Sequence, residues 1–219
     1  MKPALLALFA LLPLGQALAA EIPLYPTGPS EDSAFLRFFN AGETPLELNA
    51  ANGASLRLAG EQRASDFLTV PAGKPIQGSL KQGDAQQALD VSVEPGEFAT
   101  VIGLGNGKEL RLVTLREQPD DFNALKASLA FYSLDGSCAN AGLQAAGRNV
   151  DIFKDVAEGS LQRRSINPLK LSVQLRCGGA AVGQPLDLGQ LAAGQRYTLF
   201  LVPSAQGPRL FQAVDNLAN

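Results

Sequence analysis

Apolar and polar residues alternate with a period of two along much of this chain. Residues 89–94 read Leu-Asp-Val-Ser-Val-Glu, and residues 169–176 read Leu-Lys-Leu-Ser-Val-Gln-Leu-Arg. Successive side chains of a strand point to opposite faces, so this period predicts strands with one face buried and the other in water. Turn sequences such as Asn-Gly and Pro-Gly separate these segments. The pattern therefore predicts an all-β protein built from antiparallel β-sandwiches.

The sequence also matches itself at two similar shifts. Residues 96–102 (GEFATVI) align with 194–200 (GQRYTLF) at a shift of 98, and the same shift carries Arg-Leu-Val at 111–113 onto Arg-Leu-Phe at 209–211 without a gap. Nearer the start of each half, residues 34–38 align with 128–132 at a shift of 94. A gapless match that keeps a turn glycine, a threonine and an arginine predicts an internal duplication.

The first twenty residues have the composition of a secretory signal. Lys2 precedes an apolar run over residues 4–14, and Ala17-Leu18-Ala19 has the small-x-small pattern of a cleavage site. The run is shorter than the roughly 20 residues that a membrane-spanning helix needs. No cysteine stands at the junction to carry a lipid. We therefore expect a soluble mature protein outside the cytoplasm.

These features predict five segments in the chain. A proline-rich extended arm follows the signal, and Pro119 with its acidic neighbours marks a hydrated connection after the strand at 110–116. Two stretches, 121–127 and 139–147, are candidates for a short helical turn. The predicted layout is a signal at 1–20, an arm at 21–33, a first sandwich at 34–116, a linker at 117–125 and a second sandwich at 126–219.

The two halves differ in charge. Residues 21–116 contain 8 basic and 12 acidic side chains, whereas residues 126–219 contain 9 basic and 6 acidic ones. The overall charge of −3 gives no reason to expect a nucleic-acid partner. Opposite charge would let the domains face differently charged partners, although ordinary solvated surfaces can differ as much.

Both cysteines, Cys138 and Cys177, lie in the second half. Two thiols in one half of a secreted protein most often pair, so we predict a disulfide between them. Closing a loop of about 40 residues would contribute roughly 3–4 kcal/mol by the chain-entropy model. Two free buried thiols are the alternative. A metal site is disfavoured because the chain has no histidine to complete the ligands.

The absence of histidine also limits the chemistry that the chain can perform. Ser-His-Asp and Cys-His nucleophiles are impossible, and no Ser-x-x-Lys sequence is present. Asp135-Gly136-Ser137 is predicted to be a tight turn, and residues 103–107 (GLGNG) a hairpin turn rather than a phosphate-binding loop. The acidic pairs at 120–121 and at Asp151 and Asp155 are predicted to be surface charge. No catalytic residue and no cofactor is expected.

The densest basic stretch offers candidate binding residues: Arg148, Lys154, Arg163, Arg164 and Lys170. Guanidinium groups bind carboxylates bidentately, so an anionic polysaccharide or an acidic partner could be held here. The alternative is a solvated strand edge whose charges prevent aggregation. The chain has no tryptophan that could stack on a sugar ring.

The start of the expected mature chain carries a family resemblance. Leu24-Tyr25-Pro26, then Pro29, then residues 33–40 (SAFLRFFN) resemble the AlgF family, and the similarity extends over the mature chain with its paired β-domains and late cysteines. Members are periplasmic components of alginate O-acetylation. The resemblance implies a membrane-bound acyl carrier of the MBOAT type and periplasmic SGNH-type acetyltransferases as partners, so that acetyl groups reach mannuronate residues of this biofilm exopolysaccharide.

Resemblance and composition together predict a non-catalytic adaptor in the periplasm, because a chain without histidine cannot transfer acetyl groups as its partners do. Alginate itself is a further candidate partner. Two other hypotheses stay open. One is a binding module for an anionic exopolysaccharide, and the other is a histidine-free relay that carries an acyl group on a serine.

Overall fold

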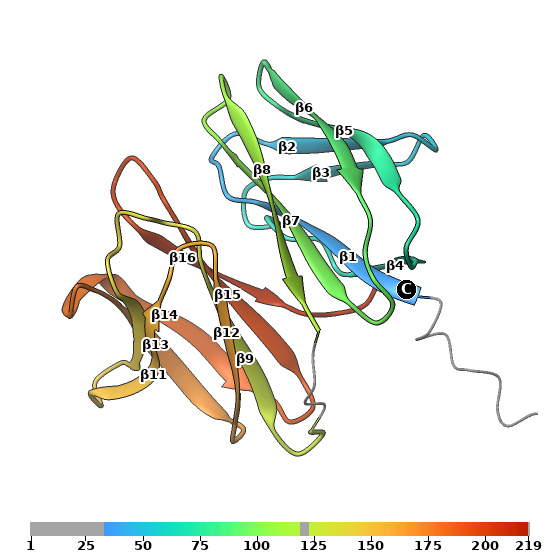
Figure 1. Cartoon of the computed structure of the whole chain (residues 1–219). Coiled ribbons are helices and arrows are strands. Elements are labelled where there is room, and N and C mark those ends of the chain that lie inside the picture. The colour runs from blue at the N-terminus through green and yellow to red at the C-terminus, as the bar shows by residue number, and fades with distance from the viewer. Residues whose placement is uncertain (1–32, 119–122, 219) are drawn as a thin grey trace, which may run out of the picture.

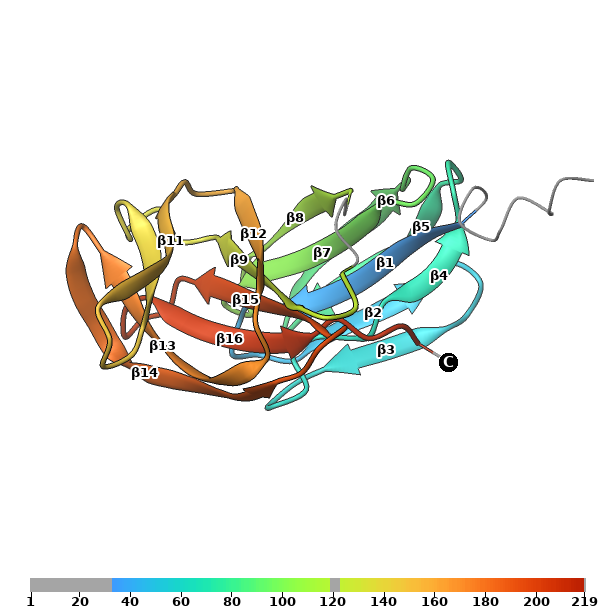
Figure 2. The same ribbon diagram turned by 90° about the horizontal axis from the view of Figure 1, so that it is seen from below.

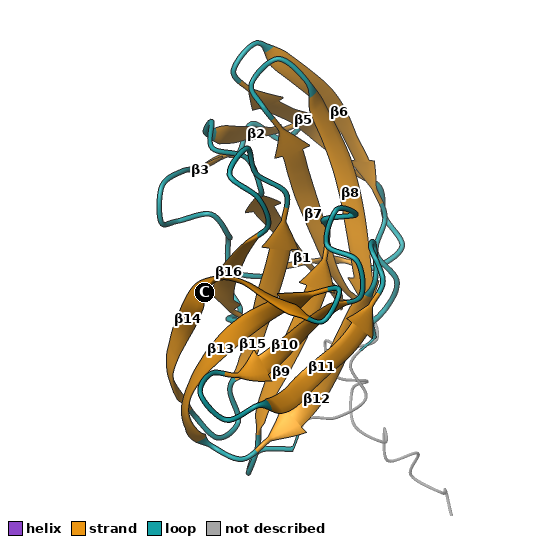
Figure 3. Cartoon of the chain, turned by 90° about the vertical axis from the view of Figure 1, so that its left-hand side faces the viewer, coloured by secondary structure: helices purple, strands orange, loops and turns teal. Residues whose placement is uncertain are grey.

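The computed structural model describes residues 33–118 and 123–218, which form sixteen β-strands and no helix (Figure 3). The predicted signal, residues 21–32 of the arm and residues 119–122 of the linker lie outside the described residues. The strands form four sheets of four strands. Two sheets come from each half of the chain and make two lobes (Figure 1). The predicted pair of β-sandwich domains is confirmed.

The first domain contains sheets with the strand orders β4-β1-β7-β8 and β3-β2-β5-β6. Its strands are β1 (Ser33–Asn40), β2 (Leu46–Ala50), β3 (Ser55–Leu58), β4 (Leu68–Pro71), β5 (Ile76–Gln82), β6 (Ala85–Val91), β7 (Phe98–Gly105) and β8 (Leu110–Glu117).

The second domain contains sheets with the orders β12-β9-β15-β16 and β11-β10-β13-β14. Its strands are β9 (Ala127–Ser133), β10 (Ala141–Ala145), β11 (Val150–Val156), β12 (Leu161–Ile166), β13 (Leu169–Cys177), β14 (Ala180–Leu191), β15 (Arg196–Val202) and β16 (Arg209–Val214).

The two domains have one topology. Each strand of the first domain has the position of the strand eight numbers later in the second, so the strand order confirms the duplication. The sheets are not purely antiparallel as expected, because β1 pairs with β7, and β9 with β15, in the parallel direction. In each case most of the strands between the two partners belong to the other sheet. The second partner therefore starts at the same end of the sheet as the first one does. Alternation along a strand carries no information about its direction, which is why the sequence did not reveal these pairs.

One of the two predicted alignment shifts is wrong by one residue. Phe35 pairs with Phe98, and Ser128 with Arg196. A shift of 98 between β7 and β15 therefore implies a shift of 93, not 94, between β1 and β9. Since a slip of one residue exchanges the faces of a strand, the correction matters. It aligns Leu36 with Leu129, and both are buried in the cores of their domains.

No helical turn is present at 139–147 or in residues 123–127, the described part of the other predicted stretch. The first stretch contains β10, in which Ala141 and Leu143 are fully buried in the core at the spacing of a strand. In the described part of the second, Lys126 N donates to Asn123 O and closes a single turn before β9. Tertiary burial outweighs the weak helix preference of an alanine-rich segment. The hairpin predicted at 103–107 is present, but its turn lies at 106–109, because residues 103–105 belong to β7. The turn predicted at 135–137 is confirmed, because Cys138 N donates to Asp135 O across it.

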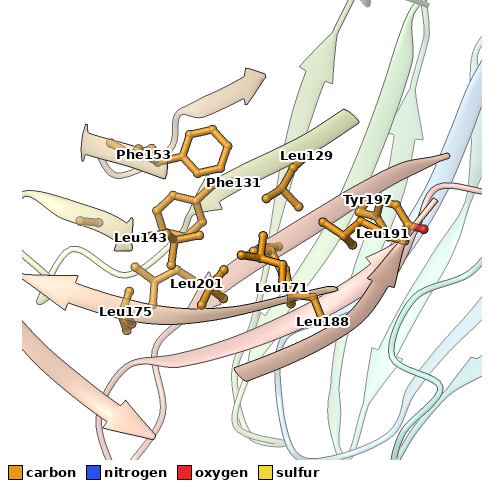
Figure 4. Close-up of a cluster of buried hydrophobic side chains, with 14 of the residues drawn as sticks. Leu129, Phe131, Leu143, Phe153, Leu171, Leu175, Leu188, Leu191, Tyr197 and Leu201 are labelled. Carbon is orange, nitrogen blue, oxygen red and sulfur yellow. The ribbon is translucent and has the colours of Figure 1, made fainter. Parts of the chain in front are cut away.

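Each domain encloses its own apolar core. In the second domain, Leu129 and Phe131 of β9 project toward Leu171 and Leu175 of β13 (Figure 4). The Phe153 ring from β11 lies 5.8 Å from that of Phe131. In the first domain, equivalent side chains such as Leu36, Phe38, Leu48 and Leu80 fill the same space. These cores account for the period of two seen in the sequence.

A tie joins the fifth strand of each domain to the loop between its first two strands. In the second domain the tie is the predicted disulfide, which is confirmed: Cys138 in the β9–β10 loop is bonded to Cys177 at the end of β13, with Cα atoms 4.8 Å apart. In the first domain Gln82 ends β5, and its Nε2 donates to Asn40 Oδ1 at 2.8 Å and to Thr44 O at 3.0 Å. Gln82 and Cys177 both directly precede a two-residue hairpin turn, so they occupy the same place.

The last described residues cross back to the first domain. Phe67 N donates to Asn216 O, and Ala218 N donates to Phe67 O, both at 2.8 Å. Leu217 thereby forms a parallel bridge with Phe67, just before β4. The end of the chain accordingly lies beside the first domain (Figures 1 and 2).

Candidate functional site

The sheets β4-β1-β7-β8 and β12-β9-β15-β16 meet at a contact that we call the interdomain seam (Figure 2). Its centre is apolar, and the rings of Phe39 and Phe200 stack with centroids 4.0 Å apart. Tyr132 continues this stack at 5.5 Å from Phe200. The buried residues of the seam are Phe39, Ala41, Ile102, Leu115, Tyr132, Leu134, Phe200, Val202 and Ala213.

The two domains contribute equivalent positions to the seam. With the corrected shifts, Phe39 corresponds to Tyr132, and Ile102 corresponds to Phe200. The domains therefore meet through the same face, as do the subunits of a two-fold dimer. This contact explains why β1, β7, β9 and β15 read as nearly continuous apolar runs, since both of their faces are covered.

Arg37 of β1 is the central charged residue at one end of the seam. Its side chain is 1 % exposed and faces the carboxylate of Asp215, which is 2 % exposed, with Nη1 2.7 Å from Oδ1. Its Nε donates to Thr100 Oγ1 and its Nη2 to Thr198 Oγ1, each at 2.9 Å. The guanidinium also lies 4.3 Å above the ring of Phe67. The ion pair and these hydrogen bonds offset the free-energy cost of burying the charge of Arg37.

Arg163 of β12 extends this cluster toward the linker. Its guanidinium binds Glu117 in a bidentate manner, and its Nη2 lies 3.1 Å from Asp215 Oδ2. Arg196 reaches the same Glu117 at 3.4 Å. We call Arg37, Arg163, Arg196, Glu117 and Asp215 the seam cluster. It joins the last residue of β8 to strands of the second domain and so links the domains by charge as well as by apolar contact.

The seam cluster shifts the pKa values of its members. Burial would raise the pKa of Asp215, but the guanidiniums of Arg37 and Arg163 outweigh it and hold this pKa below the ordinary value. Burial, followed by repulsion from Arg163, lowers the pKa of Arg196. Burial, followed by the charge of Glu117, raises the pKa of Tyr132 well above its usual range. Asp215 is thus ionised at neutral pH, while the tyrosine beside it stays neutral.

This arrangement suits a structural role better than a chemical one. The two carboxylates are held by guanidinium groups, so neither is poised to accept a proton from a substrate. Removing one partner of a buried ion pair typically costs about 3–5 kcal/mol, because the other charge is left uncompensated. The seam cluster therefore fixes the two domains in one relative orientation.

A second polar contact and a hollow lie toward the other end of the seam. Glu43 lies 3.1 Å from Arg63 of its own domain and 2.5 Å from Arg209 of the other. The ring of Phe211 contacts both guanidiniums, at 4.4 and 5.0 Å. Beside them lies a hollow of about 630 Å³, lined by the β1–β2, β7–β8 and β15–β16 connections. Ser204 in this lining donates its hydroxyl hydrogen to Gly207 O at 2.7 Å and so belongs to a turn.

The predicted contact residues do not form one site. Arg163 lies in the seam cluster with its side chain 15 % exposed. Arg164 is on β12, and its Nη1 donates to Ile152 O of β11 at 2.6 Å. Lys154 and Lys170 belong to the sheet β11-β10-β13-β14, and Arg148 is exposed in the β10–β11 turn. Contact with a polymer or a partner at these residues stays a prediction.

Sequence reasoning missed Arg37 and Asp215. Arg37 stands inside the run of 33–40 that was noted for resemblance only, and its partner lies 178 residues away. A signal was present, because the shift of 98 aligns Thr100 with Thr198 and Glu117 with Asp215. Polar residues retained at equivalent strand positions of both repeats indicate a shared polar contact.

Residues 33–118 and 123–218 contain no helix long and apolar enough to cross a membrane. They also contain no group of three or more acidic, cysteine or histidine side chains placed to hold a metal ion.

Comparison with known proteins identifies similar sequences. A protein-family model described as "Alginate O-acetyl transferase AlgF" matches residues 7–198. "Alginate biosynthesis protein AlgF" of Pseudomonas aeruginosa is 31 % identical over 86 % of this chain and 81 % of that protein, and its namesake in Pseudomonas putida is 26 % identical over 84 % and 80 %. Among solved structures, the C-terminal domain of AlgF from P. aeruginosa is 28 % identical, covering 41 % of this chain and 98 % of that domain with a TM-score of 0.35.

Proposed function

Since this chain belongs to the AlgF family, we propose that it is a non-catalytic periplasmic adaptor of alginate O-acetylation, needed for the transfer of acetyl groups to mannuronate residues. The seam cluster is the observation that carries the proposal. Its five charged side chains bind one another across the two domains, and an adaptor needs such a fixed arrangement of binding surfaces.

The side chains that could act as nucleophiles support a non-catalytic role. The chain has no histidine, and its two cysteines are bonded to each other. Ser137, in the turn that most resembles a nucleophile turn, donates to Asp135 Oδ1 at 2.6 Å. Asp135 also accepts from Ser137 N at 2.9 Å, which is the geometry of a side-chain-capped turn. A serine in this setting is held by its own turn rather than presented to an acyl donor.

The proposed partners are SGNH-type acetyltransferases of the periplasm and a membrane protein of the MBOAT type. The family resemblance suggests them, and the opposite charge of the two domains is compatible with two different docking partners. In this scheme the chain would hold the donor and acceptor enzymes at a set distance along the growing polymer.

The test is a pull-down of the chain from solubilised cell envelope, with a tag directly after the signal. Mass spectrometry should identify SGNH-type acetyltransferases or the MBOAT protein among the recovered proteins. A strain lacking the chain should secrete alginate with little or no acetyl, and the wild-type gene should restore it. Full acetylation without the chain would overturn the proposal.

A second measurement separates the adaptor from the two other hypotheses. Mannuronate oligomers titrated into the protein should give no saturable, salt-sensitive binding if the chain acts only on proteins. Incubation with an acetyl donor, followed by intact mass, should give no acetylated serine. Saturable polymer binding without any protein partner would favour the polysaccharide-binding module, and a labelled serine would favour the relay.

A further inference from the structure

Strand β6 forms an open edge of the first domain. It pairs with β5 in an unbroken register, from Ala85 opposite Gln82 to Val91 opposite Ile76, and no other strand of residues 33–118 and 123–218 pairs with it. It lies on the side of the first domain that faces away from the second (Figures 1 and 3). A molecule that binds this edge therefore leaves the interdomain seam untouched.

The main chain of β6 presents unused hydrogen-bonding groups at this edge. Gln82 and Ala85 flank a two-residue turn, so they exchange both main-chain hydrogen bonds, and every second residue of β6 after Ala85 also bonds to β5. The N–H and C=O groups of Gln86, Ala88 and Asp90 accordingly point outward. Within the described part of the chain, none of these outward groups has a hydrogen-bond partner.

The other edges of the four sheets carry features that hinder pairing with a further strand. β3 and β4 have four residues each, β11 has a bulge, and β14 has Pro185 and two register shifts. The remaining edge strands contain arginine: Arg111 and Arg116 in β8, Arg163 and Arg164 in β12, and Arg209 in β16. In contrast, β6 is seven residues long and has no proline, bulge, lysine or arginine.

The comparison of β6 with β14 shows that the fold does not require an open edge here. The shared topology gives the two strands equivalent outer positions, next to β5 and β13 respectively. In β14, Gly183 and Gly189 have positive φ angles of 66° and 69° and stand at the two register shifts. The regular, unprotected edge is therefore a property of the first domain alone.

The sequence of β6 is complementary to itself. When two copies pair in the antiparallel direction about Ala88, Gln86 of each copy lies opposite the partner's Asp90. Both side chains are exposed on the outer face of the sheet, so the Gln86 amide can donate to that carboxylate. The small Ala88 lies at the two-fold axis, and no like charges face each other. Only this centring engages all three outward residues, in about six main-chain hydrogen bonds.

We propose that the mature chain forms a weak two-fold dimer in which β6 pairs with β6 of a second copy. The sheet β3-β2-β5-β6 then continues into the same sheet of that copy. Such a contact uses the same surface on both copies, so it closes at two copies and does not extend into a fibre. The inference is independent of the proposed adaptor function, although a dimer would present every partner-binding surface twice.

A strand is the occupant that matches this edge. Alternating N–H and C=O groups along an extended main chain are satisfied by the main chain of another strand, which is how peptides add to sheet edges in general. Among strands, β6 itself places Gln86 against Asp90 twice, once on each side of Ala88. This double match is the observation that identifies a second copy as the occupant.

The first test is analytical ultracentrifugation of the purified mature chain over a range of concentrations. A single pair of strands is a small interface, so we expect a dissociation constant of about 10–100 μM. Ala88→Pro removes an outward N–H that no bond within the chain uses and places a ring at the axis, so this variant should stay monomeric. Ser55→Pro makes the matching change at the opposite edge, on β3, and should dimerise as the wild type does.

Charge substitutions at position 86 test the register. Gln86→Glu places a carboxylate opposite the partner's Asp90 at both ends of the interface and should weaken the dimer at least threefold. Gln86→Lys places opposite charges there and should strengthen the dimer by a similar factor. Asn49→Glu adds a charge to the exposed face of β2 in the same sheet and should leave the dimer unchanged.

A cysteine at the axis provides evidence that does not depend on affinity. The two native cysteines are bonded to each other, so Ala88→Cys adds the single free thiol of the chain. Opposite Cα atoms of a hydrogen-bonded pair lie about 5.5 Å apart, which a disulfide spans. Mild oxidation should therefore give a covalent dimer from Ala88→Cys and not from Asn49→Cys.

The outcomes decide the inference in either direction. A wild type that stays monomeric at ten times the expected dissociation constant would overturn it. A dimer that Ala88→Pro and Gln86→Glu leave unchanged would place the contact elsewhere and overturn it as well. If Ala88→Pro proves unfolded by circular dichroism, the charge variants and the crosslink still decide. If the wild type is monomeric and Ala88→Pro instead loses a co-purifying protein, the edge binds another protein's strand and self-pairing is wrong.

Discussion

The two domains share one strand order but tie the end of their fifth strand by different chemistry. In the second domain a covalent bond joins Cys138 to Cys177. In the first domain the same place is held by hydrogen bonds from Gln82 to Asn40 and Thr44, with Gln82 fully buried and Asn40 1 % exposed. The shared requirement is therefore a link between this strand end and the first loop.

The difference between the ties lies in what each does to the unfolded chain. Hydrogen bonds exist only in the folded state, and each contributes a net 1 kcal/mol or so. A disulfide also restricts the unfolded chain and so raises its free energy. The second domain should therefore resist local opening more strongly than the first.

The largest effect is expected from Asp215→Ala, which would uncouple the domains and let their ties be compared separately. The change leaves the buried Arg37 guanidinium without its nearest carboxylate, at a cost of about 3–5 kcal/mol. Calorimetry should then show two unfolding transitions instead of one. A single transition at the wild-type temperature would mean that the apolar part of the seam is sufficient.

Acid should reproduce this uncoupling in the wild type. Because the folded pKa of Asp215 is depressed, its contribution to stability is present above the unfolded pKa of about 3.9 and is lost as the pH falls through the lower folded value. The seam should therefore weaken only below about pH 4, and Asp215→Asn should abolish this pH dependence. Separation of the domains between pH 5 and 7 would contradict the assignment.

Removing the disulfide should have the next largest effect, and only on the second domain. Cys138→Ser with Cys177→Ser should lower its free energy of unfolding by about 3–4 kcal/mol. Chemical denaturation in the Asp215→Ala background can resolve the two domains. An equal loss in the first domain would show that the seam, and not the tie, sets the stability of both.

Asn40→Ala removes a partner of Gln82 in the tie of the first domain, as the cysteine substitutions remove the tie of the second. It should lower the free energy of unfolding of the first domain by about 2–3 kcal/mol. Its Nδ2 donates to Thr44 O at 2.9 Å and to Leu58 O at 3.0 Å, and its Oδ1 accepts from Gly42 N and Gln82 Nε2. The substitution leaves several of these buried groups without a partner. The same denaturation experiment should assign the loss to the first domain, and Asn49→Ala, on the exposed face of β2, is the matched control.

Gln82→Leu should have the smallest effect and lower the free energy of unfolding of the first domain by about 1 kcal/mol or less. Gln82 occupies the position that corresponds to Cys177, but its loss should be much less destabilising than the loss of the disulfide. Its Oε1 accepts no hydrogen bond within the described residues, and Asn40 still reaches Thr44 O after the change. A loss as large as that from removing the disulfide would show that the hydrogen-bonded tie is not redundant.

The sequence predicted the fold well because its cores have the strand period. The duplication followed from β7 and β15, where a turn glycine fixes the alignment, but β1 and β9 were aligned one residue out of place. An apolar run buried on both faces, such as 34–39, has no alternation to show which side chain points inward.

The candidate sites were much harder to predict. Arg37 and Asp215 meet across 178 residues, and a lone arginine in a strand looks like one that faces water. Arg163 was singled out as a basic residue, but the sequence could not show that it turns toward Glu117 rather than outward. Strand β11 has a bulge at Lys154 and Asp155 that depends on a positive φ at Asp155, an angle that this residue type permits but does not predict.

The bridge between Leu217 and Phe67 has a consequence for the order in which the chain matures. The strand end beside β4 receives its partner from residues that lie about 150 positions later in the sequence, so this edge of the first domain stays open during synthesis until those residues have emerged. A deletion of residues 216–218 would thus act on a region made much earlier. Labels and affinity tags are best placed away from these residues.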